Sequence, residues 1–455
     1  MTPRALIGGI AGRFESVLGA AANALDESVA ARPTGLEGSL RLWARASIGG
    51  VILSVVLLGH ITETQPYFYA VMGMSLAVYV MVRGESLVPA LLQYLRSPMT
   101  AWRWAFVTWA AISLLWTARG GLSVDRVITL FEIQIVGLVF FDAARNLGQA
   151  EWMLKFVLAC TVAAALHALA TEDPMTTLRL AGAYRNPNTL GIVAVIGMTA
   201  CVAVMGEVRR VWGVAASYVA IMVLSVGVLA SSSLKGIAGT GFVMIGSLFF
   251  RRTRSRVLVL LAIGAAAVTI LILTFEPMHL LWEHTVDRVE VTLTNFETTA
   301  EVGQSLYLRT RFIKEGLELM AESPIVGTGL HTFSWLSDAG TYAHTNFVEV
   351  GVSLGIIGVL LYYAFHVSVF LRVLELKKHG GLLWRFTLLY IPMITLLDVA
   401  NVSYAHKLTS LLLIMCAGWL ERLREERRVG AVHRAGGEPA GGSGTWNAQE
   451  EALSA

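Results

Sequence analysis

His344 stands at the start of a strongly apolar run, in the stretch AHTNFVEVGVSLGIIG. An imidazole exchanges its proton near neutral pH, so a histidine at the mouth of a membrane helix can serve as a general base. The alternative is a histidine that only hydrogen-bonds within a loop. No acidic residue adjoins His344, and Glu349, five positions later, is expected on another side of a helix. We therefore predict a base without an orienting carboxylate.

Lys235 is a second residue suited to chemistry. The stretch SSSLKG places it between two apolar runs. A charge beside a membrane helix is costly and usually has a partner or a ligand. A phosphate would suit the ammonium group, which acts as a compact point charge. In the alternative interpretation, the lysine only snorkels to the membrane interface.

Three arginines could share a phosphate with Lys235, because arginine binds phosphate oxygens in pairs. Arg309 and Arg311 lie on an expected amphipathic helix, which a Ser-Pro pair ends just before a Gly-x-Gly bend. Arg185 precedes the stretch NPNTLG, in which the proline fits the start of a helix and Asn188 is expected to cap it. The alternative for each arginine is plain surface solubility.

The composition fixes the setting of these residues. The chain has 455 residues, of which 55% are hydrophobic and 15% charged, and its mean hydropathy is +0.63. A soluble protein usually carries about a quarter charged residues. Long apolar runs recur from about residue 46 to residue 420, each close to the roughly 20 residues that cross a bilayer. These features predict an all-α polytopic membrane protein with membrane lipids, and no nucleic acid, as partners.

Cysteine usage and acidic residues argue against redox and metal chemistry. The chain has three cysteines, all inside apolar runs, and none forms a Cys-x-x-Cys pair. Histidine, aspartate and glutamate show no clear metal-ligand spacing. We expect no disulfide framework, no metal and no other cofactor.

The hydropathy pattern predicts about 12 membrane-spanning helices, since unpaired backbone groups are costly in lipid. The expected spans are 46–60, 66–82, 101–117, 124–141, 153–171, 188–206, 211–230, 234–250, 256–275, 347–370, 382–400 and 406–420.

These spans divide the chain into five parts. Residues 1–45 form a cytoplasmic segment whose apolar residues recur at helical spacing, as in an interfacial amphipathic helix or else a loosely ordered tail. Residues 46–275 hold nine spans, 276–346 one large loop with short helices, and 347–420 three further spans. The remaining residues, 421–455, are expected to be a disordered cytoplasmic tail.

The basic residues give the orientation. With both termini in the cytoplasm, most of the 35 lysines and arginines lie on the inside, as the positive-inside rule requires. Lys235, Arg185, Arg309 and Arg311 are among the minority outside. Such cations on the outer side favour a common site for an anionic headgroup.

In this order, the motifs resemble those of the O-antigen ligase and polymerase superfamily over roughly residues 45–420. Members carry His, then Asn, Ser or Gln, nine residues and Gly-x-x-Gly after one large periplasmic loop. Here His344, Thr345, nine residues and Gly355-Ile356-Ile357-Gly358 match that spacing, with Thr345 in place of the usual residue.

Two other motifs extend the resemblance. The loop stretch is similar to the family's segment of Ser, Arg, amphipathic helix, Pro and Gly-x-Gly, with Arg309 at the arginine position and Arg311 as a near rival. Lys235 stands where the family usually has arginine, a change that removes the bidentate fork.

The resemblance implies a GT-C-like fold in the bacterial inner membrane, with the active site facing the periplasm. It implies a metal-independent, inverting transfer of a glycan from undecaprenyl pyrophosphate. His344 would be the base, and Lys235 and Arg309, aided by Arg311 and Arg185, would bind the pyrophosphate.

The acceptor is left open. We favour O-antigen ligation to lipid A-core; the alternatives are polymerisation onto a growing glycan and transfer to a protein side chain. A polytopic transporter or lipid flippase is the alternative from another class. A transporter more often shows two similar halves, and no clear internal repeat is present here.

Overall fold

The computed structural model describes residues 34–58, 65–117, 120–172, 177, 179–184, 186–274, 276–294, 301–338, 340–376 and 381–435. Every regular element in these ranges is helical, so the predicted all-α class is confirmed. The possible interfacial helix predicted near the N-terminus lies mostly in residues 1–33, outside the described part of the chain.

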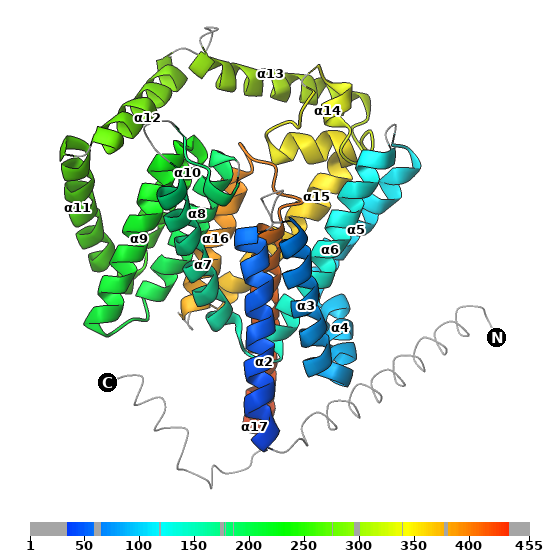
Figure 1. Ribbon diagram of the computed structural model, residues 1–455. Helices are drawn as coiled ribbons and strands as arrows, with labels where there is room; N and C mark the ends of the chain where they lie inside the picture. Colours follow the sequence, from blue (N-terminus) through cyan, green and yellow to red (C-terminus); the bar gives the residue numbers. More distant parts are fainter. Residues whose placement is uncertain are drawn as a thin grey trace.

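The helices form one bundle with an arch at one end (Figure 1). Those of the bundle are α2 (Thr34–Leu53), α3 (Gln65–Arg83), α4 (Leu87–Arg96), α5 (Pro98–Ile112), α6 (Gly120–Arg145), α7 (Ala150–Thr171), α8 (Pro187–Met205), α9 (Val211–Ser231), α10 (Leu234–Ser247), α11 (Arg251–Thr274), α15 (Asn346–Glu375), α16 (Leu382–Leu397) and α17 (Lys407–Ala435). The arch consists of α12 (Glu276–Thr294), α13 (Glu301–Glu322) and α14 (Phe333–Leu336).

Seven helical segments are long and apolar enough to cross a membrane: Leu40–Leu58, Tyr67–Arg96, Gly120–Arg145, Ala150–Thr171, Pro187–Met205, Val211–Ser231 and Asn346–Glu375. Each coincides with an expected span. The other expected spans also fall on helices, but several are short: α5 has 15 residues, α10 has 14 and α16 has 16. Among the described residues the structure therefore supports seven spans by length and composition, fewer than the expected 12.

Helix α8 lies at the centre of the bundle. It packs against α7, α9, α10 and α16, and 83% of its apolar window is buried inside the protein. Its sequence is apolar on all sides and rich in Gly, Ala and Val, which is the pattern of a helix surrounded by other helices. This central helix carries Asn186 and Asn188 to the end of the bundle beneath the arch.

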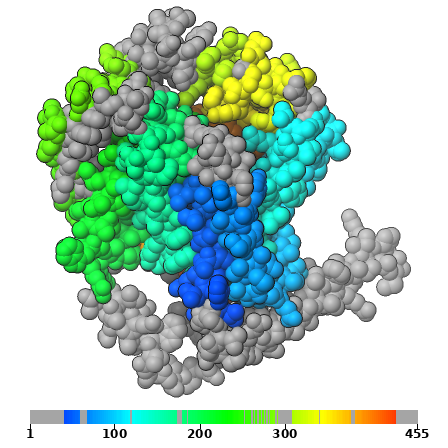
Figure 2. All heavy atoms as spheres, in the orientation of Figure 1, coloured from blue at the N-terminus to red at the C-terminus, as the bar shows by residue number. Residues whose placement is uncertain are grey.

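Within the large loop, the predicted helix, Ser-Pro end and glycine bend are present, but α12 and α13, with 19 and 22 residues, are longer than the short helices expected. Helix α13 ends at Glu322, directly before Ser323-Pro324, and Gly327 and Gly329 adopt φ values of 73° and 105°. These left-handed values favour glycine. In the space-filling view, this part of the loop lies along one end of the molecule (Figure 2).

Glycines such as those after His344 often let neighbouring membrane helices approach closely, but Gly355 has a different role. Gly355 interrupts α15 with φ 63° and ψ −168°. The bend after α13 docks onto this interruption: Thr328 N donates to Val352 O at 2.8 Å, and Ile356 N donates to Pro324 O at 2.9 Å. The close approach is thus between the large loop and α15, and it fixes the arch to the bundle.

Helix α17 continues past residue 420, the end of the last expected span, to Ala435. Residues 421–428 of this helix combine arginines with Glu421, Glu425 and Glu426, and Arg422 pairs with Glu426 at 2.8 Å. Such pairs four positions apart support a helix. The segment expected to be a disordered tail from residue 421 therefore begins as a helix, and residues 436–455 lie outside the described part.

Candidate active site

His344 lies in the turn that leads into α15. Its φ of 59° is left-handed, an uncommon conformation for a residue with a side chain and one that clusters at functional sites. The half-buried imidazole stacks on the Phe312 ring with centroids 5.8 Å apart and contacts the Tyr342 ring at 4.3 Å. Two aromatic rings from the large loop therefore hold the predicted base in one orientation.

Two of the predicted cations act on His344. Burial lowers the pKa of His344 most, and the charges of Lys235 and Arg309 lower it further, to about 4. The imidazole is consequently neutral at neutral pH, which is the form that accepts a proton. Residues 235, 309 and 344, from α10, α13 and the turn before α15, thus come together at one site.

Lys235 sits in the first turn of α10. Ser233 starts this helix by accepting a hydrogen bond from Gly236 N at 3.2 Å. The lysine side chain is buried, with 6% of its surface exposed, and Nζ donates to Asn401 Oδ1 at the long distance of 3.4 Å. An ammonium group has three donors, so a ligand can take the remaining ones.

The two rival arginines are separated by the structure. Arg309 is half-buried, and its charge reaches Lys235, Tyr342 and His344. Arg311 is 44% exposed and pairs with Glu315 at 2.5 Å and with Asp338 at 3.2 Å. The structure brings Arg309 to the site and leaves Arg311 on the outer surface of α13.

The stretch with Arg185 is partly described. Arg185 itself lies outside the described residues. Asn186, rather than Asn188, caps α8, because its Oδ1 accepts from Asn188 N at 2.9 Å. Asn188 Oδ1 instead accepts from Ser233 at 3.2 Å and from Arg179 at 3.3 Å.

Arg179 is a cation that the motifs did not single out. Its Nε donates to Ser231 O at 3.3 Å, and its charge acts on Lys235. It precedes the Asn-Pro-Asn turn by seven residues, in a segment without a recognisable spacing. Only the folded chain shows that it belongs to the surroundings of Lys235.

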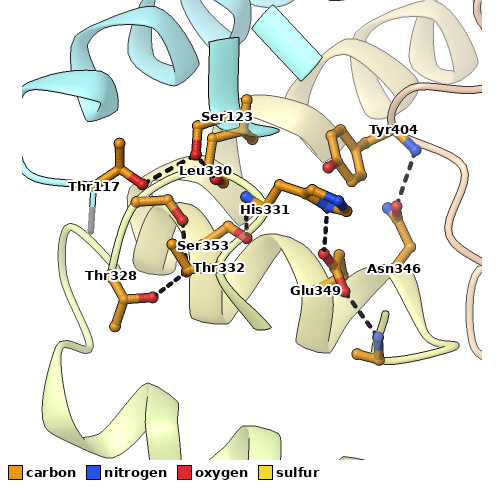
Figure 3. A network of polar contacts seen from close by, with 12 residues as sticks. Thr117, Ser123, Thr328, Leu330, His331, Thr332, Asn346, Glu349, Ser353 and Tyr404 are labelled. Atoms are coloured by element: carbon orange, nitrogen blue, oxygen red, sulfur yellow. Dashed lines mark hydrogen bonds and ion pairs between the residues drawn. The ribbon is translucent and has the colours of Figure 1, made fainter. Parts of the chain in front are cut away.

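A polar cavity of about 210 Å³ opens beside Lys235. It lies between α6, the start of α8, α10, α15 and the segment between α16 and α17. Its lining includes Arg126, His331, Tyr342, Glu349 and Tyr404. Several of these side chains appear in Figure 3.

Glu349 corrects one expectation. It does not point away from the His344 turn: its Oε2 accepts from Ala343 N at 2.8 Å, and its Oε1 lies 3.5 Å from His331 Nδ1 (Figure 3). Helical spacing does not apply between the two residues, since α15 begins only at Asn346. The carboxyl group thus anchors the backbone beside the predicted base rather than its imidazole.

Comparison with known proteins gives two matches. Residues 219–363 match the family model described as O-Antigen ligase; this segment contains Lys235, Arg309, His344 and Gly355. The chain is also similar to the exopolysaccharide production protein ExoQ of Rhizobium meliloti (strain 1021), with 24% identity over 375 residues. That alignment covers 74% of this chain and 81% of the relative.

Proposed function

Because this chain belongs to the O-antigen ligase and polymerase superfamily, we propose that it transfers a glycan from undecaprenyl pyrophosphate to an acceptor hydroxyl. The observation that carries this proposal is the meeting of a neutral imidazole with two cations at one end of an apolar bundle. Both substrates of such a reaction can arrive anchored in the membrane.

His344 is the proposed general base. Sugar hydroxyls are weak nucleophiles, and a positioned base speeds their attack. The imidazole takes the hydroxyl proton as the acceptor oxygen bonds to the anomeric carbon of the donor. The bond from that carbon to the pyrophosphate oxygen breaks on the opposite side, so the configuration inverts.

Lys235 and Arg309 are the proposed binding groups for the leaving pyrophosphate. Negative charge grows on this group as its bond to the sugar breaks, and fixed cations stabilise such charge in the transition state. Pyrophosphate leaves without a general acid, and because the two side-chain cations offset its growing charge, we propose that the reaction needs no metal. Arg185 remains a proposed member of this set on the sequence motif alone, and the exposed ion pairs of Arg311 argue for a lesser role.

The orientation of the site is proposed from the distribution of basic residues. Both termini would lie in the cytoplasm, and the arch would face the periplasm from the inner membrane. Lipid-linked glycans presented at that face would then reach His344 from the bilayer edge.

We favour ligation of O-antigen to lipid A-core, with polymerisation of repeat units as the second candidate. Polymerisation stays a candidate because the chain is similar to an exopolysaccharide production protein. A gel of surface and carrier-linked glycan from a strain lacking the gene separates the two. Long chains stranded on the carrier with bare lipid A-core indicate a ligase, whereas single repeat units indicate a polymerase. An unchanged profile contradicts both and favours transport or another polymer.

A further inference from the structure

We propose that the cavity beside Lys235 is a monosaccharide subsite, in which the side chains of Glu349, His331 and Tyr404 receive the hydroxyl groups of one sugar ring. We call it the Glu349 cavity. This inference rests on the proposed function, since it assigns a sugar of the same reaction to a place next to the pyrophosphate.

Two buried polar atoms at the cavity lack hydrogen bonds. Glu349 is fully buried and Tyr404 is 2% exposed, yet neither Glu349 Oε1 nor the Tyr404 hydroxyl has a hydrogen-bond partner among the described residues. A buried polar group without a partner costs about 1–3 kcal/mol, and such groups in native proteins call for an explanation. A ligand that bonds to both atoms supplies one.

His331 faces the same space. Its left-handed backbone, with φ 60°, is held by a hydrogen bond from His331 N to Ser353 Oγ at 3.1 Å. The imidazole Nδ1 lies at ion-pair distance from Glu349 Oε1, 3.5 Å, as the dashed line in Figure 3 marks, but the contact does not meet hydrogen-bond geometry. The ring lies below that of Tyr404 in the same view. The carboxyl oxygen of Glu349, the phenol of Tyr404 and the imidazole of His331 therefore all border the Glu349 cavity.

This set of groups suits sugar hydroxyls. A hydroxyl both donates and accepts, so adjacent hydroxyls can donate to a carboxyl oxygen and accept from a phenol or an imidazole. The cavity volume of about 210 Å³ falls below the roughly 300–1,000 Å³ of drug-sized ligand sites. It fits one ring rather than an extended glycan.

The position of the cavity ties the sugar to the reaction. Lys235 forms part of its wall, and Tyr342 both lines it and contacts the His344 ring. A ring bound there would lie next to Lys235 and, across the Tyr342 side chain, near the base. It is either the first sugar of the donor or the attacking sugar of the acceptor.

Tyr404→Phe is the sharpest variant. The substitution removes a hydroxyl that bonds to no described residue, so a purely structural role predicts no loss of stability. Glu349→Gln is the second variant, because an amide oxygen can still accept from Ala343 N and keep the His344 turn in place. Tyr362→Phe is the matched control: its hydroxyl bonds to Ser403 at 2.8 Å, and it does not line the cavity.

The experiment uses the purified full-length protein in lipid nanodiscs. Two probes are titrated: undecaprenyl pyrophosphate alone, and the carrier-linked glycan extracted from a strain lacking the gene. The KM for the acceptor is measured in parallel. Lys235→Ala is included, since it tests carrier binding independently of the cavity.

We expect Tyr404→Phe and Glu349→Gln to weaken a sugar contact by roughly three- to tenfold, the effect of one hydrogen bond. If affinity falls for the glycan-bearing carrier and not for the bare carrier, the subsite holds the donor sugar. If only the acceptor KM rises, it holds the acceptor sugar.

Unchanged affinities and KM in both variants, or an equal loss for both carriers, would overturn the subsite. Lys235→Ala separates this result from failure of the proposed function. If Lys235→Ala is the one variant that loses binding to the bare carrier, the proposed pyrophosphate site is supported and only the sugar subsite is overturned.

Discussion

Gly327 and Gly355 meet backbone to backbone where the large loop docks on α15. A Cβ placed on Gly327 would lie 2.5 Å from Gly355 N, and a Cβ on Gly355 would lie 2.2 Å from Ile325 O. Neither position leaves room for a side chain. The contact fixes the end of α13 relative to α15, the helix that follows His344. Arg309 lies further back on α13.

Gly355→Ala should therefore destabilise the protein and reduce its activity. The φ and ψ of Gly355 belong to a region that is essentially restricted to glycine, and the strain costs about 1–3 kcal/mol. Thermal unfolding in detergent measures the loss. Gly73→Ala on α3 is the control, since a Cβ there meets nothing within 4 Å. Equal stability of the two variants would contradict the docking role of Gly355.

The pH dependence tests the environment of His344. Its pKa is about 4 in the folded protein, below the ordinary 6.5, so the unfolded chain binds more protons between these values. Stability from this group is complete above about pH 6.5 and is lost as the pH falls toward 4. The acid limb of kcat/KM should likewise lie near pH 4. An acid limb near pH 6.5 would contradict the claim that burial and the neighbouring cations lower the pKa of His344.

Bound pyrophosphate should change that profile in a defined direction. Its negative charge offsets Lys235 and Arg309, so the acid limb of kcat, which reports the substrate complex, should lie at a higher pH than that of kcat/KM. Lys235→Ala should raise the kcat/KM limb as well. Superimposable profiles for kcat and kcat/KM would argue against an anion beside His344.

Substitution of Lys235 tests the donor site. Lys235→Ala should lower the transfer rate by roughly 10²–10³-fold, as expected for loss of one group that stabilises transition-state charge. Lys235→Arg should retain activity, because the guanidinium keeps the charge and adjoins a cavity of about 210 Å³. Normal activity of Lys235→Ala would remove the pyrophosphate role.

Arg309 and Arg311 provide a matched pair on one helix. Arg309→Ala should cause a large loss of transfer, because its half-buried charge reaches His344. Arg311→Ala breaks exposed ion pairs worth about 0–1 kcal/mol, so its effect should be small. Comparable losses in a glycan-transfer assay would mean that both arginines bind the donor.

The sequence predicts much of the helical fold because apolar runs of membrane length have few alternatives. It does not predict which of two arginines serves the site. Arg309 and Arg311 are two residues apart, which is about 200° around a helix, so their side chains face opposite ways. The packing of α13 on α15 decides that Arg309 is the one that faces the site. The number of spans is equally unresolved by hydropathy, since α5, α10 and α16 are shorter than a full crossing.

Other features depend on contacts between distant parts of the chain. Arg179 hydrogen-bonds to Ser231, 52 positions later in the chain, and no local sequence pattern predicts that contact. Glu349 was expected to face away from His344, but the chain reverses at a left-handed residue before α15 begins. The sequence motif includes Gly355. It does not show that the bend after α13 packs against this glycine, a contact that only the fold reveals.

The most direct test of the account is the transfer rate of purified His344→Ala with carrier-linked glycan and acceptor. A general base contributes roughly 10²–10⁴-fold, so we expect a loss of at least about 100-fold while the variant remains membrane-inserted and still binds the donor. A transfer rate equal to that of the unmodified protein would contradict the assignment of His344 as the base.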